Sequence, residues 1–374
     1  MKRLLLLGGG HAHVEVMRDF GRAPPPDTHV TVLSRARFTP YSGMLPGLVA
    51  GHYRHEESHI DLAWLARSTG CDFVEAEARH LDPRERAVAC TDDSRAGYDV
   101  ISIDIGSTPA AAGVPGADSH TLAIKPVDAF LARWKTIEAR VAAGERLRIA
   151  VVGGGAGGVE LLLSLQDRLH AAVRGETRFV LLTDQSDILL SHNRKVRGIF
   201  REVLASRKIE LLVHHAVVRV DPGRLHCANG ETVEADVIVW VTTAAAPQWI
   251  AQSGLTTDHR GFIAVNDCLQ SASHKNVFAA GDIATMVNHA LPKSGVYAVR
   301  QGPPLARNLR RAVASERLAE YTPQRLALAL IGTGDRSAVA SYGPFAARGE
   351  WIWRWKEWID RRWIGRYLPP GEAG

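Results

Sequence analysis

The chain has 374 residues, of which 46% are hydrophobic and 23% charged, so a disordered chain is not expected. Basic residues exceed acidic ones by 45 − 40 = 5, but they are scattered and lack interleaved aromatic residues until the last 25 positions, so we expect no nucleic-acid partner. No stretch approaches the ~18 apolar residues of a transmembrane helix, so we expect a cytoplasmic protein for which only peripheral membrane contact is open. The four cysteines lie far apart in the sequence and are expected to be reduced, without a zinc knuckle or local disulfide.

A glycine-rich turn follows the first predicted strand. The basic and apolar start is like that of a signal peptide, but the apolar run ends after four residues at Gly8-Gly9-Gly10 and indicates a strand. A helix from Ala12 to Phe20 and a strand from His29 to Leu33 complete a βαβ unit. Glycines allow the sharp turn and bring backbone N–H groups close to a pyrophosphate at the helix N-terminus. The segment therefore predicts a dinucleotide site.

A second turn of the same kind lies roughly one domain further along the chain. Strand Arg148–Val152 leads into Gly153-Gly154-Gly155, a helix from Val159 to about Val173 and a strand from Phe179 to Leu182. Later, Val277-Phe278-Ala279-Ala280-Gly281-Asp282 places a carboxylate at the end of another strand. Two such turns predict two dinucleotides and electron transfer between them.

These features resemble the pyridine nucleotide-disulfide oxidoreductase superfamily over about residues 1–310. Within it the chain is most similar to type II NADH dehydrogenases, and among these to relatives associated with selenide,water dikinase; the motifs are residues 8–14, 39–47, 102–107 and 291–306. The resemblance implies an α/β fold with two Rossmann-like domains, for FAD and NAD(P)H, the second inserted in the first, and a short C-terminal helical cap. The expected boundaries are 1–125 and 261–315 for the FAD domain, 126–260 for the NAD(P)H domain and 316–374 for the cap.

For FAD, the resemblance implies Gly8 and Gly10 at the pyrophosphate and Asp282 at the ribityl chain. Two residues depart from the family pattern, since His13 replaces the third glycine and Ser34 stands where an acidic residue usually binds the adenosine ribose. The other residues expected at FAD are His11, Arg35, Pro40, Tyr41, Ala78, Gly106 and Gly281.

For the nicotinamide nucleotide, the cradle is formed by Gly153, Gly155 and Gly158. Asp184 follows the next strand, where a carboxylate binds the adenosine ribose and repels a 2′-phosphate, so NADH is favoured over NADPH unless Thr183 takes that position. Glu160 lies in the first turn of the expected helix, and the resemblance implies a catalytic place for it near the nicotinamide and flavin.

The electron acceptor is expected to react directly with the flavin. Disulfide reductases carry paired cysteines in the segment corresponding to residues 39–44, and this chain has none there, which excludes a dithiol relay at that place. The resemblance places Pro292, Tyr297 and Gln301, with Lys293 and Arg300 as catalytic residues, near the flavin and a quinone pocket. The usual Ala-Gln…Gln pattern is absent from this segment, so the acceptor stays open between a quinone and another small oxidant.

A metal site is not expected, because the pair His11 and His13 has no cysteine nearby in the sequence and a His-x-His pair by itself is usually not a metal site. We expect His11 to donate to a phosphate and His13 to pack internally. Asp104, in an apolar strand, is expected to have a buried basic or hydroxyl partner and a structural role.

The C-terminal segment predicts an amphipathic helix whose apolar stripe consists of Trp351, Ile352, Trp355, Trp358 and Ile359. The stripe fits peripheral attachment to a membrane, and it fits equally well packing against the FAD domain or a second subunit of a homodimer.

The sequence thus predicts an FAD-dependent NAD(P)H oxidoreductase in which hydride passes from nicotinamide C4 to flavin N5 and then to a small acceptor. Two alternatives remain open, a flavin-binding redox partner or sensor linked to selenium metabolism and a soluble reductase of a selenium or sulfur compound.

Overall fold

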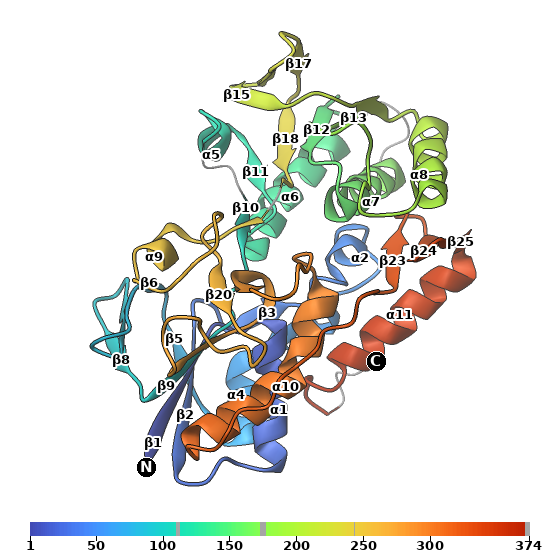
Figure 1. The fold of residues 1–374 in the computed structure, drawn as a ribbon. Coiled ribbons are helices and arrows are strands. Elements are labelled where there is room, and N and C mark those ends of the chain that lie inside the picture. The colour runs from blue at the N-terminus through green and yellow to red at the C-terminus, as the bar shows by residue number, and fades with distance from the viewer. Residues whose placement is uncertain (110–112, 173–176, 243, 371–374) are drawn as a thin grey trace.

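Two parallel five-stranded sheets form the centre of the fold (Figure 1). The computed structural model describes residues 1–109, 113–172, 177–242 and 244–370. The first sheet has the order β21 (Val277–Ala279), β9 (Val100–Ile103), β1 (Lys2–Leu7), β2 (Thr28–Ser34) and β5 (Asp72–Glu75). The second has the order β11 (Leu122–Ala123), β18 (Val237–Trp240), β12 (Arg148–Val152), β13 (Arg178–Leu182) and β14 (Glu210–Leu212). Because β21 returns to the first sheet after the second is complete, the second unit is inserted in the first, which confirms the predicted fold class.

Helices cover the faces of both sheets. Around the first sheet lie α1 (His11–Arg22), α4 (Leu62–Thr69) and α10 (Gly295–Val313), and around the second lie α6 (Val127–Ala142), α7 (Ala156–Ala172) and α8 (Arg194–Ser206). The end of the predicted helix at Val173 lies outside the described residues. β11 lies before the expected boundary at residue 126 and pairs with β18, while the domain boundaries themselves stay a prediction.

Small elements join these layers. The antiparallel ones are β3 (Phe38–Pro40) with β4 (His59–Asp61), β10 (Thr108–Pro109) with β19 (Ala244–Ala245), β6 (Ala78–Asp82), β7 (Ala87–Cys90) and β8 (Arg95–Gly97), and β15 (Val217–Asp221), β16 (Arg224–Cys227) and β17 (Thr232–Glu234). A parallel pair is formed by β20 (Ile263–Val265) and β22 (Ala284–Met286). Short helices are α2 (Leu45–Val49), α3 (His55–Ser58), α5 (Ala117–His120), α9 (Gln248–Ala251) and the 3₁₀ turn Gly281–Ile283.

The C-terminal part is more than the helical cap that the sequence predicted. It contains a three-stranded antiparallel sheet of β23 (Ala329–Gly332), β24 (Ala338–Tyr342) and β25 (Phe345–Gly349), followed by α11 (Glu350–Ile364). β23 and β25 are short and partly exposed, so their residues lack the continuous apolar run that marked the buried parallel strands.

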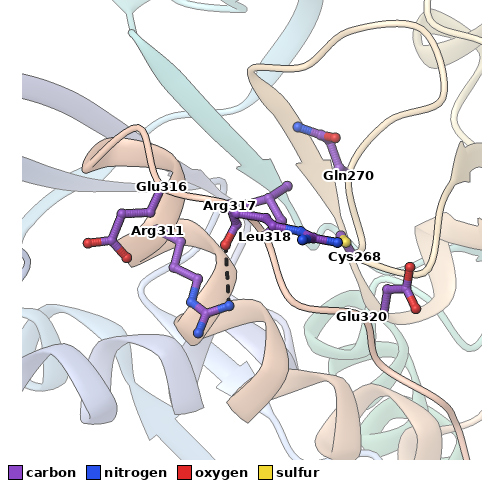
Figure 2. A pocket seen from close by; sticks show the side chains of 7 residues that line it. All are labelled: Cys268, Gln270, Arg311, Glu316, Arg317, Leu318 and Glu320. Atoms are coloured by element: carbon purple, nitrogen blue, oxygen red, sulfur yellow. Dashed lines mark hydrogen bonds between the residues drawn. The ribbon is translucent and has the colours of Figure 1, made fainter.

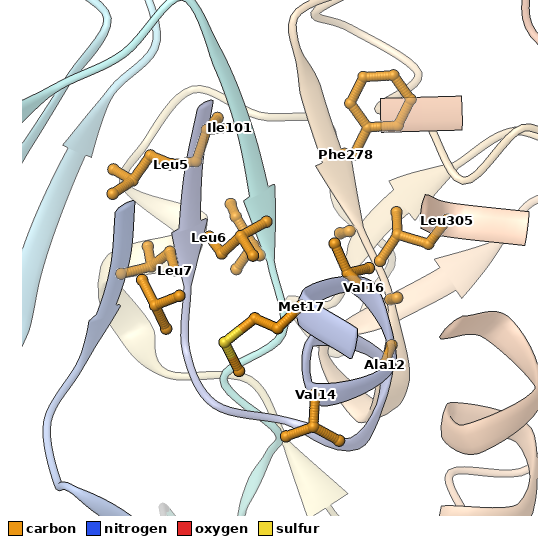
Figure 3. Close-up of a cluster of buried hydrophobic side chains, with 14 of the residues drawn as sticks. Leu5, Leu6, Leu7, Ala12, Val14, Val16, Met17, Ile101, Phe278 and Leu305 are labelled. Atoms are coloured by element: carbon orange, nitrogen blue, oxygen red, sulfur yellow. The ribbon is translucent and has the colours of Figure 1, made fainter. Parts of the chain in front are cut away.

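The core of the first unit explains why β1 reads as an unbroken apolar run. Leu4 to Leu7 are all at most 2% exposed, because parallel strands in such a sheet are buried on both faces. Figure 3 shows Leu5, Leu6 and Leu7 of β1 next to α1, whose Met17 points toward β1 and whose Val16 lies close to Leu305 of α10. This packing fixes the N-terminus of α1 at the end of β1.

Asp104 stabilises that helix N-terminus, which corrects the partner predicted for it. Its carboxylate accepts hydrogen bonds from the backbone N–H groups of Ala12 (2.9 Å) and His13 (3.2 Å), not from a basic or hydroxyl side chain. The first-turn N–H groups of a helix have no intrahelical acceptor, so a buried carboxylate satisfies them. Burial raises the pKa of Asp104 to about 7 despite these bonds.

His13 packs inside the turn, as expected of a side chain in place of the third glycine. Its Nδ1 donates to the carbonyl of Gly8 (2.6 Å) and its Nε2 accepts from the hydroxyl of Ser102 (2.8 Å). The protein thus satisfies both ring nitrogens, and a place for His13 at FAD stays a prediction.

The raised pKa of Asp104 predicts a pH-dependent stability. Between its unfolded pKa of ~3.9 and its folded pKa of about 7, only the folded state holds the proton, so the stability from this group falls as the pH rises through that range. Asp104→Asn keeps an oxygen for the two N–H groups and cannot ionise. The thermal unfolding midpoint of the variant should fall less between pH 5 and pH 8 than that of the wild type. Equal falls in the two proteins would contradict this role of Asp104.

Candidate active site

Asp282 lies where the first sheet meets the chain that leads to the second. It follows β21 in the 3₁₀ turn and accepts from the hydroxyl of Ser107 (3.2 Å) and from Nζ of Lys125 (3.4 Å). Gly281, at φ +68°, donates its N–H to the side chain of Gln301 (2.7 Å) on α10. Three distant segments therefore hold one carboxylate, which is 22% exposed, at this sheet edge.

The glycines of both turns fit a nucleotide pyrophosphate. Gly8 (φ +97°) and Gly153 (φ +131°) have backbone conformations that favour glycine, and a Cβ atom on Gly158 would lie 2.0 Å from the carbonyl of Gly153. A Cβ atom on Gly155, in contrast, would meet none of the described residues within 4 Å. The backbone there is open on the side of the described residues, as the approach of a pyrophosphate requires.

The remaining residues expected at FAD lie around the same sheet edge. Ser34 is buried at the end of β2 and Arg35 follows it on the surface, while Ala78 begins β6. Gly106 has φ +71° after β9, and Gly10 is kept free of a Cβ atom by the Asp104 carboxylate, 2.2 Å from where that atom would lie.

An aromatic cluster covers the loop after β3. Tyr41 stacks on Trp363 of α11 with ring centres 4.3 Å apart, and His11 contacts both rings edge-on. Pro40 precedes the cluster at the end of β3. Burial lowers the pKa of His11 to about 4, so its ring is neutral at physiological pH, and the backbone N–H of Ser42 donates to its Nε2 (3.4 Å).

A buried charged group lies next to this cluster. Lys356 of α11 donates to the carbonyl of Gly43 and to Asp360 (2.7 Å). Burial alone lowers the pKa of Lys356, but the carboxylates of Asp360 and Glu160 outweigh it and hold the pKa above its usual value. Glu160 accepts from the backbone N–H of Gly332 (2.7 Å), and burial raises its pKa.

The position predicted for Glu160 on its helix was wrong. α7 begins at Ala156, directly after the glycine turn, so Glu160 lies in the second turn and not the first. Its interactions are with Gly332 and Lys356 of the C-terminal part, not chiefly with the helix dipole.

The two basic residues expected near the flavin are placed differently. Lys293 donates to the carbonyl of Ala284 and the hydroxyl of Thr285 (2.9 Å), and its ammonium lies 4.1 Å from the ring centre of Phe262. Burial lowers the pKa of Lys293 to about 8. Arg300 is exposed on α10, and the structure does not bring it together with Lys293 or Glu160, so its catalytic role stays a prediction.

The strand before Asp184 ends as the sequence predicted. β13 ends at Leu182, Thr183 is buried beside Gly154, and Asp184 is the first exposed residue. An exposed carboxylate beside the second glycine turn is the position that binds an adenosine ribose in Rossmann folds.

Sequence reasoning missed three contributors to the site, Lys125, Lys356 and Trp363. Lys125 belongs to no motif, and Lys356 and Trp363 lie outside the apolar stripe that the sequence predicted for the C-terminal helix. The one available signal was the spacing of Lys356 and Asp360, which fits an i, i+4 ion pair.

The interpretation of the tryptophan stripe is corrected in one respect. Trp351, Trp355 and Trp358 are 60%, 38% and 57% exposed, so they do not pack against the FAD domain of their own chain. The helix instead presents Ile352, Asp360 and Trp363 to the protein. Among the described residues, no helix is long and apolar enough to cross a membrane.

A surface hollow lies away from these residues, at the C-terminal end of α10 (Figure 2). Arg311, Glu316, Arg317 and Glu320 line it together with Cys268, Gln270 and Leu318. Since α10 spans 19 residues, or ~28 Å, between this hollow and Lys293, the hollow is not part of the candidate active site.

The inserted second unit and the two glycine turns define a two-dinucleotide oxidoreductase fold. A family model described as pyridine nucleotide-disulphide oxidoreductase matches residues 2–302, and the chain belongs to this family. It is therefore a flavoprotein oxidoreductase that uses FAD and NAD(P)H.

Individual relatives are distant in sequence. The chain is 22% identical to an NADH dehydrogenase-like protein of Bacillus subtilis, over 90% of this chain and 91% of that one. It is 26% identical to external NADH-ubiquinone oxidoreductase 2 of Saccharomyces cerevisiae over 75% of this chain, and spans 57% of that protein. The fold is similar to that of the sulfide:quinone oxidoreductase of Aquifex aeolicus, with a TM-score of 0.82, 19% identity and coverage of 99% and 93% of the two chains.

Replacing Asp282 with Ala should lower flavin occupancy. If the carboxylate binds FAD, its loss removes a charge-assisted hydrogen bond of about 1.5–3 kcal/mol, or roughly ten- to 150-fold in the FAD dissociation constant. Absorbance of the purified protein and FAD titration of the stripped protein measure this. Asp267→Ala, at a carboxylate of similar exposure (28%) that accepts from Asn288, is the matched control and should retain FAD. Equal occupancy in the two variants would exclude Asp282 from the flavin site.

Proposed function

We propose that this oxidoreductase passes electrons from NADH directly to a quinone. The observation that carries the proposal is the covering of residues 39–44, a segment without cysteine, by the Tyr41–Trp363 stack and the Lys356–Gly43 contact. On the side of the flavin where the acceptor is expected, these contacts provide aromatic walls and a buried cation. A planar acceptor with polar groups at its edge requires both.

Several relatives carry quinone in their names, which supports the choice of acceptor. They include the yeast enzyme above, a demethylphylloquinone reductase of Synechocystis (25% identical over 75% of this chain) and a sulfide-quinone reductase of Aquifex aeolicus (22% identical over 89%). The cysteines of this chain fit sulfide chemistry poorly, because Cys71, Cys90 and Cys227 are buried and Cys268 lies at the remote hollow.

The chain's residues would bind, orient and supply a proton. FAD, when bound, accepts hydride from the nicotinamide and transfers two electrons onward; the overall change is NADH + H⁺ + quinone to NAD⁺ + quinol. Gly153, Gly155 and Gly158 hold the NADH pyrophosphate and Asp282 the flavin. Burial raises the pKa of Glu160, while the nearby Lys356 ammonium acts in the opposite direction, and this carboxyl group would relay the proton that reduction of the acceptor consumes.

Double-mixing stopped flow tests this function together with the coenzyme preference. NADH should bleach the flavin faster than NADPH, because Asp184 binds a ribose hydroxyl and repels a 2′-phosphate. A water-soluble quinone mixed in second should restore the flavin absorbance. Asp184→Ala should narrow the preference for NADH, whereas Gln185→Ala, at the next exposed position, should leave it unchanged.

Two outcomes would contradict parts of the proposal. A wild-type preference for NADPH would exclude Asp184 as the ribose-binding residue. Flavin that is reoxidised by a selenium or sulfur compound and not by quinone would favour the soluble reductase alternative, and flavin that no nucleotide reduces would favour the redox partner or sensor.

We also propose that the exposed indoles of α11 attach the protein reversibly to an anionic membrane, where a lipid-soluble acceptor resides. Trp351, Trp355 and Trp358 share one face, and exposed Arg354 and Arg362 flank them, with the Arg362 guanidinium 5.3 Å from the Trp358 ring centre. Tryptophan and arginine together are typical of helices in the membrane interface. Glu350 and Glu357 offset part of the charge, so the binding should be weak and sensitive to salt.

Replacing all three indoles by Ser should release the protein from anionic vesicles while FAD stays bound. This variant is a sharper test than truncation before Trp351, which would also remove buried Ile352, Trp363 and Tyr367. Vesicle co-sedimentation at low and high salt measures it. A matched triple change of exposed apolar residues elsewhere, Val74, Val218 and Val287 to Ser, should not affect sedimentation. Loss of a dimer in the tryptophan variant, without any wild-type vesicle binding, would assign the face to a subunit contact instead.

A further inference from the structure

Three potential metal ligands meet where the first unit joins the second. His55 lies in α3, His59 begins β4, and Asp128 is in the first turn of α6, which packs against the second sheet's α7. One ligand atom from each residue lies within 4.8 Å of the other two. The two imidazole rings are stacked 3.8 Å apart. The sequence did not reveal this group, because about 70 residues separate Asp128 from the histidines.

His59 is held rigidly in one orientation. Its side chain is fully buried, and its Nδ1 lies 3.0 Å from the backbone carbonyl of His55 and 3.1 Å from the hydroxyl of Ser58. Since a carbonyl only accepts hydrogen bonds, Nδ1 carries the proton and donates it there. The other nitrogen, Nε2, is then a bare lone pair.

That lone pair is buried and has no hydrogen-bond partner in the part of the chain that the structure describes. It faces the carboxylate of Asp128, with 4.0 Å between Nε2 and Oδ1. A nitrogen lone pair and a carboxylate that face each other repel unless a cation lies between them.

We propose that His55, His59 and Asp128 bind a divalent transition-metal ion of the zinc class. Two imidazole nitrogens and a carboxylate oxygen are a usual ligand set for zinc, with water completing a tetrahedron. A ligating histidine commonly donates its second ring N–H to a backbone carbonyl, as His59 does. Ligand separations must contract to ~3.4 Å for metal–ligand distances of ~2.1 Å, and exposed His55 and Asp128 are free to rotate inward toward fixed His59.

The ion would act as a structural tie between the two units. It would join α3 and β4, on the side of the first sheet, to the start of α6 on the side of the second. Asp128 lies three residues after Lys125, which contacts Ser107 and Asp282 at the candidate flavin site. The metal ion would therefore fix the position of the chain segment that contains Lys125, and with it the contact of Lys125 with Asp282.

Zinc titration of the FAD-bound, chelator-treated protein in competition with a chromophoric chelator tests the proposal. The wild type should bind one equivalent, and its thermal midpoint should rise until one equivalent has been added. His55→Asn and Asp128→Asn, both at exposed side chains, should weaken zinc binding at least tenfold and abolish the rise in midpoint. They should keep the flavin absorbance and the zinc-free midpoint of the wild type.

His29→Asn is the matched control, since His29 and Asp72 form an exposed His–Asp pair 3.1 Å apart, with no third metal ligand near it among the described residues. This variant should bind zinc as the wild type does. The proposal is overturned if the wild type takes up no stoichiometric zinc, or if His55→Asn and Asp128→Asn bind it as tightly as the wild type and His29→Asn. Either result would leave the flavin and NADH measurements above unaffected.

Discussion

The contact on which the candidate active site depends most is that of the Lys356 ammonium. Lys356 extends from α11 to the carbonyl of Gly43 on the first unit, pairs with Asp360, and faces Glu160 on α7 of the second unit. Removing one partner of a buried ion pair commonly costs about 3–5 kcal/mol, because the remaining charge stays buried. The Lys356 ammonium, paired with Asp360 on its own helix, thus joins α11 to Gly43 of the first unit and faces Glu160 of the second.

This constraint explains the unusual polarity of α11. An amphipathic helix ordinarily turns its apolar stripe inward, yet here Lys356 and Asp360 point inward and three indoles point outward. The inner face retains apolar anchors in Ile352, Trp363 and Ile364, which give the buried charges a dry setting. The outer face of α11, with its three exposed indoles, is then available to contact a membrane or another protein.

The glycine turns show a similar division between internal and external requirements. Gly8 and Gly153 have positive φ angles that favour glycine. At Gly155 the described residues leave open space beside the backbone. In the first turn, the His13 side chain fills the space between helix and strand that a third glycine would leave free, and it bonds to Ser102. Asp104 accepts from the N–H of Ala12 at the start of the helix. The departure from the glycine pattern is therefore compensated within the protein.

The sequence by itself determined the parallel sheets, both glycine turns and the position of Asp184, because strand–turn–helix units are local and their apolar runs report burial on both faces. It also determined the absence of paired cysteines in residues 39–44. Only the tertiary structure decided the partner of Asp104, the surroundings of Glu160, the inward face of α11 and the meeting of His55 and His59 with Asp128. Each of these joins residues from elements far apart in sequence, and no periodicity within one element encodes which distant element packs against it.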